Sequence, residues 1–299
     1  MARMIDGKWE GEWRPTDGEG DGKFHRKPSV FRDQLPDGPI EPGRYHLFVA
    51  WTCPWAHRTL LFRALKGLQD VIPVHFANVL TDKSWAFEDP TASPHGDDFL
   101  YQLYLRADPQ YTGRVTVPVL WDEVEQRIVN NESSEIIAML DRLPSPAPTL
   151  RPTEHLDAIA AWGDRMYDAL NNGVYRAGFA TGQDAYDEAV KGVFQTLDAL
   201  EEHLTGRSWL VGDHVTEADL RLFVTALRFD AAYVPFFRCN LRRYADYDNL
   251  SAHLQRVYDL PGVPETLNLH EIRKGYGSIA QVNPTGILPI GPPTRLVLR

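Results

Sequence analysis

Four prolines stand within ten residues in the segment LPSPAPTLRP, residues 143–152. Proline lacks the backbone N–H and fixes φ, so this segment suits neither the interior of a helix nor that of a sheet. The patterns on its two sides differ. Before it, apolar runs typical of strands alternate with helical spacing, and after it only helical spacing occurs. The sequence therefore predicts two domains joined by a linker at residues 144–152.

Before the linker, the spacing of apolar residues predicts a βαβ unit. Residues 44–51 form a short apolar run typical of a strand, and residues 54–66 carry apolar side chains at helical spacing. Residues 71–80 predict a second strand, which gives the unit the length that a parallel crossover needs. A hairpin over 115–129 and a helix over 132–143 follow, so the expected order is β-α-β-(α)-β-β-α.

Two stretches around this unit have no clear period. Residues 1–43 are rich in Gly, Pro and charge, which predicts an irregular N-terminal arm. Residues 81–113 are too long for a simple loop and contain enough aromatic residues to line a cleft. We expect a short helix within them.

After the linker, every recognisable pattern is helical. Helical spacing extends over residues 153–170, 183–204, 216–234 and 248–258. Thr216 and Asp219 stand three positions apart before an apolar run, as in a capping box that starts a helix. The tail from residue 268 contains alternating prolines and glycines and is not expected to form a long helix. We therefore expect an all-α domain over 153–265 and a separate tail over 266–299.

The composition excludes several classes of function. The formal net charge of −10 disfavours nucleic-acid binding, because neutralising phosphates requires clustered Lys and Arg. No stretch of about 20 apolar residues occurs, and the N-terminus is polar, so we expect a soluble, unexported protein of the cytoplasm without a membrane partner. The two cysteines and ten histidines form no metal-ligand spacing, and no phosphate-binding loop occurs. We expect neither a metal nor a nucleotide.

Cys53 stands between a predicted strand and a predicted helix, in the segment WTCPWAHR. The thiolate is the reactive form of cysteine, and a helix N-terminus favours it through unpaired N–H groups and the helix dipole. Pro54 suits the first helical position. The alternative is a buried cysteine that acts as a small apolar residue, which is the interpretation we adopt for Cys239. No CxxC motif occurs, so Cys53 needs an external thiol as its partner.

Val117 and Pro118 interrupt an apolar run that otherwise predicts a strand. Proline removes a hydrogen-bond donor from a sheet and is normally confined to an edge or a bulge. In thioredoxin-like folds, which the predicted unit resembles, a cis-proline at the start of the third strand exposes the preceding backbone to a peptide-like ligand. This resemblance implies a cis Val117–Pro118 bond. The alternative is a trans proline on an edge strand.

Glu132 and Ser133 open a predicted helix. Ser133 can offer its hydroxyl and backbone N–H to a carboxylate, while Glu132 can pair with an amino group. Together they suit the head of an α-amino acid, such as the γ-glutamyl end of glutathione. The alternative is that the pair simply caps the helix.

Several segments resemble one family. The first domain resembles the N-terminal domain of the glutathione transferases, and a larger set of segments resembles the glutathionyl-hydroquinone reductases, or Xi class. These segments are WTCPWAHR, TVPVLWD, NNESSEII, NNGVYRAGF, TEADLRLF, RFDAAYV, RCN and NPTGILPIGP. The likeness covers residues 25–291. It implies the glutathione-transferase fold, with an α/β thioredoxin-like N-terminal domain over 44–143 and an all-α C-terminal domain.

The resemblance also implies roles for single residues. Cys53 resembles the catalytic nucleophile, and the residues that resemble glutathione contacts are Trp85, Arg114, Val117, Glu132 and Ser133. Tyr175 and Tyr276 resemble the hydroxyls that line a quinol pocket, which the tail over 266–299 completes. The alternative interpretations are that Arg114 is a solvated charge and that the two tyrosines are packing residues. A homodimer is a further implication of the family.

The implied reaction is the reduction of a glutathionyl-hydroquinone through a mixed disulfide between Cys53 and glutathione. A second glutathione then releases oxidised glutathione, so glutathione is a co-substrate and not a bound cofactor. One alternative is an Omega-like thioltransferase or dehydroascorbate reductase, which shares the Cys53 step and differs in the acceptor. Another is a non-catalytic glutathione-binding module of the same fold, in which Cys53 does not react.

Overall fold

The computed structural model describes residues 3–10, 23, 28–81 and 84–298. The chain divides into two compact units: unit 1 is Met1–Asp17 with Arg26–Pro148, and unit 2 is Gly18–His25 with Thr149–Arg299. The division after Pro148 lies within the stretch 144–152, where the sequence predicts a linker. Residues 11–22 and 24–27 of the predicted arm lie outside the described residues.

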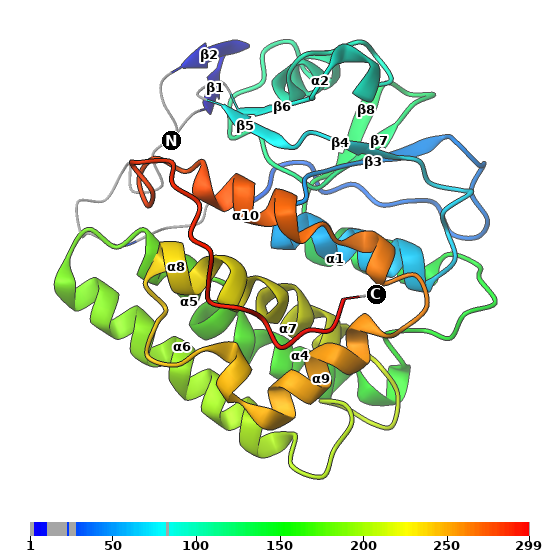
Figure 1. Ribbon diagram of the computed structural model, residues 1–299. Helices are drawn as coiled ribbons and strands as arrows, with labels where there is room; N and C mark the ends of the chain where they lie inside the picture. The colour runs from blue at the N-terminus through cyan, green and yellow to red at the C-terminus, as the bar shows by residue number, and fades with distance from the viewer. Residues whose placement is uncertain (1–2, 11–22, 24–27, 82–83, 299) are drawn as a thin grey trace. The chain divides into compact units, whose positions relative to one another are not determined.

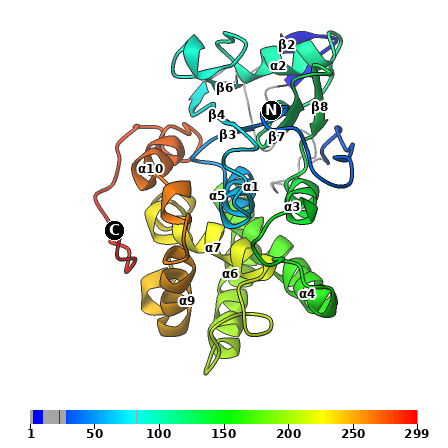
Figure 2. The ribbon, with the colours of Figure 1, turned by 90° about the vertical axis from the view of Figure 1, so that its right-hand side faces the viewer.

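In its described residues, unit 1 combines a four-stranded sheet and two two-stranded sheets with three α-helices (Figure 1). Its strands are β1 (Arg3–Ile5), β2 (Lys8–Glu10), β3 (Tyr45–Val49), β4 (Val74–Phe76), β5 (Val79–Thr81), β6 (Ser84–Ala86), β7 (Val119–Asp122) and β8 (Arg127–Asn130). Its α-helices are α1 (Pro54–Leu65), α2 (Leu100–Ala107) and α3 (Ser133–Arg142). Figure 2 shows α1 and α3 on one face of the four-stranded sheet and α2 on the other.

The four-stranded sheet has the order β4-β3-β7-β8. Strands β3 and β4 are parallel, as the predicted βαβ unit requires, whereas β7 runs antiparallel to both β3 and β8. Phe48 lies opposite Val119, and Leu120 lies opposite Asn130. The end of β3, the start of β7 and the end of β8 therefore share one edge of the sheet.

The expected elements of unit 1 are present, with two differences. The strand predicted over 71–80 is two short strands, β4 and β5, because the chain leaves the sheet at Ala77 and Asn78. The arm predicted as irregular begins with the hairpin of β1 and β2, and Met4 exchanges backbone hydrogen bonds with Gly113. Three-residue strands carry too little periodicity to stand out in a sequence.

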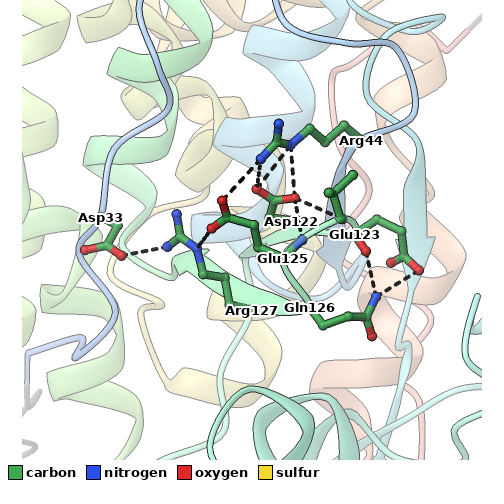
Figure 3. Close-up of polar contacts among 8 residues, drawn as sticks. Asp33, Arg44, Asp122, Glu123, Glu125, Gln126 and Arg127 are labelled. Carbon is green, nitrogen blue, oxygen red and sulfur yellow. Dashed lines mark hydrogen bonds and ion pairs between the residues drawn. The ribbon is translucent and has the colours of Figure 1, made fainter.

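A polar network fixes the β7–β8 hairpin to the start of β3 (Figure 3). The buried Asp122 carboxylate accepts from Arg44 Nη2 at 2.8 Å and from the N–H groups of Val124 and Glu125. Burial by itself would raise the pKa of Asp122, but these donors hold it below its ordinary value. Arg127 lies beside this cluster and pairs with Glu125. The network therefore holds β7 in register with β3.

Unit 2 is all-helical, as predicted. Its α-helices are α4 (Leu156–Met166), α5 (Gly173–Gly178), α6 (Gln183–His203), α7 (Glu217–Arg228), α8 (Val234–Phe237), α9 (Asp248–Tyr258) and α10 (Leu269–Gly277). π-Helical turns connect α4 with α5 over Tyr167–Asn171 and α7 with α8 over Phe229–Tyr233. No helix within the described ranges is long and apolar enough to cross a membrane.

Two helices of unit 2 lie outside the patterns found in the sequence. Helix α5 has only six residues, and α10 has nine residues at the start of the tail, where no helix was predicted. The chain beyond α10 is irregular, as its prolines and glycines indicate. The predicted capping box is confirmed: Asp219 accepts from the Thr216 N–H at 2.8 Å. The same carboxylate contacts buried His253, which ties α9 to α7.

A cluster of three histidines lies at strands β3 and β4 and the loop before α2. His46 Nε2 donates to the Gly43 carbonyl, so its Nδ1 accepts from His75 Nε2 at 3.1 Å. The ring of His95 packs against Trp121. Burial, and then the neighbouring His46, lower the pKa of His75 to about 4. His75 is therefore neutral in the folded unit near pH 7.

We predict that this histidine makes unit 1 sensitive to mild acid. The unfolded chain binds a proton at His75 near the ordinary pKa of 6.5, whereas the folded chain binds it only near 4. Between these values the unfolded state holds more protons, so the free energy of unfolding falls as pH decreases. His75→Gln should remove about 1 kcal/mol of the stability loss between about pH 7.5 and about pH 5.5, allowing for partial exposure.

Denaturant titrations at the two pH values measure this difference. His270→Gln is the matched control, because the His270 side chain is 79% exposed. Equal acid losses in the native protein and in His75→Gln would contradict the prediction.

Candidate active site

Cys53 is the N-cap residue of α1, just beyond the end of β3. Its Sγ accepts from the Ala56 N–H at 3.5 Å and lies 3.5 Å from the Val117 carbonyl oxygen. Pro54 occupies the first helical position, as predicted. A thiolate at this position gains a backbone donor and the positive end of the helix dipole. The half-buried side chain combines this stabilisation with access for a substrate.

Val117 lies at the same edge of the sheet. The Val117–Pro118 bond is cis, as the sequence predicts. Tyr104, on α2, supports this loop: its buried hydroxyl donates to the Thr116 carbonyl at 2.8 Å and accepts from Asn131 Nδ2 at 3.2 Å. One hydroxyl therefore connects the loop before β7 with the loop after β8. Tyr104 was not singled out in the sequence, where it is one of several aromatic residues in a stretch without a period.

Glu132 is the N-cap of α3, and Ser133 is the first residue of that helix. Glu132 Oε1 accepts from the Ser134 N–H at 3.2 Å, and Oε2 accepts from the Ser29 hydroxyl at 3.2 Å. Glu132 therefore caps the helix, as the alternative interpretation of this pair predicts. A carboxylate has about four acceptor positions, so capping leaves Glu132 able to accept further donors.

Trp85 and Arg114 lie in unit 1 outside the four-stranded sheet. Trp85 is half-buried on β6, opposite Leu80. Arg114 lies before Val117, and its carbonyl accepts from the Tyr111 hydroxyl at 2.8 Å. Burial raises the pKa of Tyr111, and the charge of Arg114 opposes this increase. Arg114 is therefore a half-buried cation rather than a fully solvated one.

The structure brings Tyr175 and Tyr276 into direct contact in unit 2. Their hydroxyl oxygens lie 2.7 Å apart, and the Tyr233 hydroxyl lies 3.1 Å from that of Tyr276. Tyr276 and Tyr233 are fully buried, whereas Tyr175 is half-buried. Tyr233 was missed in the sequence, because a tyrosine inside an apolar helical run is indistinguishable from a core residue.

Three segments build this tyrosine cluster, namely α5, the π-helical turn before α8, and α10, which carries Tyr276. The segment NNGVYRAGF forms α5, and RFDAAYV includes the π-helical turn that carries Tyr233. The ring of Phe237 packs against all three tyrosines, with centroid distances of 5.3 to 5.4 Å. A Cβ at Gly178 would lie 2.4 Å from that ring. Only glycine at position 178 leaves enough space for the ring of Phe237.

Cys239 differs from Cys53 in its surroundings. It is fully buried, and burial raises the pKa of its thiol to about 12. The structural interpretation of Cys239 is consistent with this environment. Among the residues that the structure describes, no group of three or more His, Cys, Asp or Glu side chains is arranged to hold a metal ion.

We predict that the two cysteines differ in reactivity. A chromogenic aromatic disulfide at neutral pH should label one thiol of the folded protein within minutes and the second only after denaturation. Cys53→Ala should abolish the fast phase, and Cys239→Ala, the matched control, should leave it unchanged. A fast phase that survives in Cys53→Ala, or no fast phase in the native protein, would contradict the assignment of Cys53 as an activated thiol.

Comparisons with known proteins identify both units. Residues 52–143 match the family model of the glutathione S-transferase N-terminal domain, and residues 183–256 match that of the C-terminal domain. The chain is 52% identical to the glutathionyl-hydroquinone reductase PcpF of Sphingobium chlorophenolicum, over 98% of this chain and 96% of the relative. It is 46% identical to the glutathionyl-hydroquinone reductase YqjG of Escherichia coli K12, over 98% and 95% of the two chains.

Solved structures give the same result. The glutathione S-transferase Xi of Phanerochaete chrysosporium matches with a TM-score of 0.88 and 42% identity, over 93% of this chain and 96% of the other. The glutathione-bound structure of YqjG matches with a TM-score of 0.83 and 43% identity, over 97% and 95% of the two chains. By its likeness to these proteins over nearly its whole length, the chain belongs to the Xi class of glutathione transferases, the family of the glutathionyl-hydroquinone reductases.

Proposed function

We propose that this protein catalyses the glutathione-dependent reduction of glutathionyl-hydroquinones to hydroquinones. The net reaction converts one glutathionyl-hydroquinone and one glutathione into one hydroquinone and one oxidised glutathione. The observation that carries the proposal is Cys53 at the N-cap of α1, with the Ala56 N–H directed at its Sγ. This arrangement supports thiolate chemistry without a second cysteine.

In the first step, the Cys53 thiolate attacks the sulfur that joins glutathione to the aromatic ring. The ring reacts as its keto tautomer, in which the proton of the neighbouring hydroxyl has moved to the carbon that bears the sulfur. An S–S bond forms, the sulfur–carbon bond breaks, and its electron pair enters the ring and leaves a phenolate. The phenolate takes a proton, and the hydroquinone departs. The products are a mixed disulfide on Cys53 and the reduced ring.

In the second step, the thiolate of a second glutathione attacks the mixed disulfide. A new S–S bond gives oxidised glutathione, and the electron pair of the broken bond returns to Cys53 as its thiolate. The donor from Ala56 stabilises the leaving thiolate in this step as well as the nucleophile in the first. The same helix start therefore serves both halves of the cycle.

The γ-glutamyl head of glutathione suits the start of α3. In the proposed complex, Glu132 accepts from the α-ammonium group, and the hydroxyl and N–H of Ser133 hold the α-carboxylate. The backbone of Val117 pairs with that of the tripeptide. Arg114 meets the second carboxylate, and Trp85 forms a wall of the site.

The hydroxyls of Tyr175 and Tyr276 serve the quinol in this proposal. Negative charge that reaches the ring as the sulfur–carbon bond breaks is shared with the ring oxygens. A hydroxyl donor aimed at such an oxygen lowers the barrier most if it is positioned before the reaction. The 2.7 Å contact between the two hydroxyls holds them in fixed orientation. The homodimer and the cytoplasmic location remain predictions from the sequence.

Glu132→Gln should separate glutathione binding from helix capping. The amide retains an oxygen for the Ser134 N–H, so the free energy of unfolding should change by less than about 1 kcal/mol. The loss of the charge should weaken glutathione by about 1.5 to 3 kcal/mol, or roughly 10- to 150-fold in KM. Ser29→Ala, which removes the second neighbour of the carboxylate, is the matched control. An unchanged KM in Glu132→Gln would refute the contact.

Tyr175→Phe and Tyr276→Phe should distinguish a quinol reductase from a general thioltransferase. Each change keeps the ring and removes one hydroxyl. The loss of transition-state stabilisation should be about 1 to 3 kcal/mol, so kcat/KM for a glutathionyl-hydroquinone should fall roughly 5- to 150-fold. A small mixed disulfide of glutathione has no ring oxygen that needs a donor. The kcat/KM for its reduction should therefore be almost that of the native protein. Cys53→Ala is the reference that should lose both activities.

Two results would change the assignment. Equal losses of kcat/KM on both substrates would show that the tyrosines act on the thiol exchange and not on the quinol ring. No loss on either substrate, together with activity on dehydroascorbate, would favour the Omega-like alternative.

A further inference from the structure

The N-terminal hairpin of β1 and β2 takes no part in the chemistry proposed above, but it is hydrogen-bonded to the loop before β7. Met4 and Gly113 exchange two backbone hydrogen bonds, with N–O distances of 2.8 and 3.0 Å. The Gly7 N–H donates to the Tyr111 carbonyl at 3.2 Å. The hairpin therefore holds the backbone of residues 111–113.

Side chains reinforce this contact. The Asp6 N–H donates to Thr112 Oγ1 at 2.9 Å, and the Thr112 hydroxyl donates to the Asp6 carboxylate at 3.2 Å. The Met4 side chain is buried. Gly7 has a φ of +74°, and a Cβ at this position would lie 2.1 Å from the Pro109 carbonyl oxygen. Only glycine therefore permits this close approach of the hairpin to the loop.

The other end of the loop is held independently, by Tyr104 on α2. The Thr116 N–H donates to the buried Tyr104 hydroxyl at 3.2 Å, and this hydroxyl donates to the Thr116 carbonyl at 2.8 Å. Thr116 directly precedes Val117. In the same way, Gly113 directly precedes Arg114. Each end of the loop therefore has its own support: the hairpin acts on Arg114, and Tyr104 acts on Val117.

Tyr111 extends the hold of the hairpin to Arg114. Its carbonyl accepts from Gly7, and its hydroxyl donates to the Arg114 carbonyl at 2.8 Å. The carbonyl of Gly113 accepts from the Met4 N–H. The two peptide groups that flank Arg114 are thus both hydrogen-bonded. When the guanidinium meets an anion, only its own side chain remains to be ordered.

We propose that the N-terminal hairpin is a positioning element that orients Arg114 for the glycyl carboxylate of glutathione before the tripeptide binds. An arginine on a fixed backbone loses less conformational entropy on pairing with a carboxylate than an arginine on a free loop. The proposal rests on the proposed function, which assigns Arg114 to the second carboxylate of glutathione. Val117 and Glu132 bind other parts of the tripeptide, so the hairpin should affect one end of glutathione alone.

The test is a calorimetric titration with two ligands whose thioether sulfur cannot form a disulfide with Cys53. One is S-methylglutathione, and the other is the same molecule with its glycyl carboxylate converted to a carboxamide. In the native protein we expect the carboxylate ligand to bind about tenfold more tightly, because Arg114 pairs with its charge. Gly7→Ala should reduce this ratio to about threefold, with nearly unchanged affinity for the carboxamide.

Two further variants separate the hairpin contact from backbone strain. Gly38→Ala is the matched control and should leave the ratio unchanged, because Gly38 also has a positive φ, +91°, but a Cβ there meets no atom within 4 Å. Thr112→Val removes both side-chain bonds to Asp6 and should lower the ratio to about fivefold. If Gly7→Ala fails to fold by circular dichroism, the Thr112→Val result decides the proposal.

Tyr104→Phe should give the converse result. It removes the support of Val117, whose backbone pairs with a part of the tripeptide that both ligands share. Both affinities should therefore fall by a similar factor, and their ratio should stay at the native value. A simple loss of stability of unit 1 would not change the ratio in Gly7→Ala and leave it constant in Tyr104→Phe.

Three results would overturn the proposal: no preference of the native protein for the carboxylate, a ratio that Gly7→Ala leaves at the native value, or an equal fall of the ratio in Gly38→Ala. Failure of the proposed function is recognised separately, because neither ligand is turned over. A native protein that shows the expected ratios but reduces no glutathionyl-hydroquinone would retain the role of the hairpin and lose the reductase assignment. An active reductase whose ratio does not respond to Gly7→Ala would retain the assignment and reject the role of the hairpin.

Discussion

The antiparallel pairing of β3 with β7 is the constraint on which the candidate active site depends. Because Phe48 lies opposite Val119, the chain leaves β3 toward Cys53 at the same edge where it enters β7 from Val117. The pairing of Leu120 with Asn130 brings the start of α3 to that edge as well. A shift of the register by one residue would move every side chain of the strand to the other face of the sheet. The Arg44–Asp122 contact, at the opposite end of the same pair of strands, opposes such a shift.

Two helix starts at this edge have the same design. Cys53 caps α1 through Ala56, and Glu132 caps α3 through Ser134. A helix start has N–H groups without partners inside the helix, and a negative group placed there is stabilised by them and by the dipole. In α1 that group is the proposed nucleophile, and in α3 it is a carboxylate suited to an ammonium ion. In the proposed function, capping and ligand binding are one arrangement at each site, so a capping signature in the sequence does not exclude a functional role.

The sequence predicted this edge well because its signals are local. A cysteine followed by proline between a strand and a helix, or a proline inside an apolar run, has few structural explanations. The two-domain organisation followed from equally local evidence, since prolines interrupt both kinds of secondary structure. Short elements were lost for the opposite reason. The three-residue strands of the N-terminal hairpin and the six-residue α5 are held by contacts to distant segments, as when Met4 pairs with Gly113.

The same distinction explains why Tyr233 and Tyr104 could not be found by pattern. Each stands among apolar or aromatic residues, where its polar group gives no periodic signal, and its contacts are with partners 12 to 43 residues away. The free-energy cost of burying a polar group explains why such residues need specific partners, which a sequence pattern does not show. A hydroxyl enclosed by aromatic rings is tolerated only if its hydrogen bonds are made inside the protein.

For Tyr233 the partner is Tyr276, and for Tyr276 it is also Tyr175. Phenylalanine at Tyr233 would avoid the cost of burying a hydroxyl while filling the same space against Phe237. Packing against Phe237 therefore does not account for the hydroxyl. The hydroxyl supplies the buried hydroxyl of Tyr276 with a hydrogen-bond partner inside the protein.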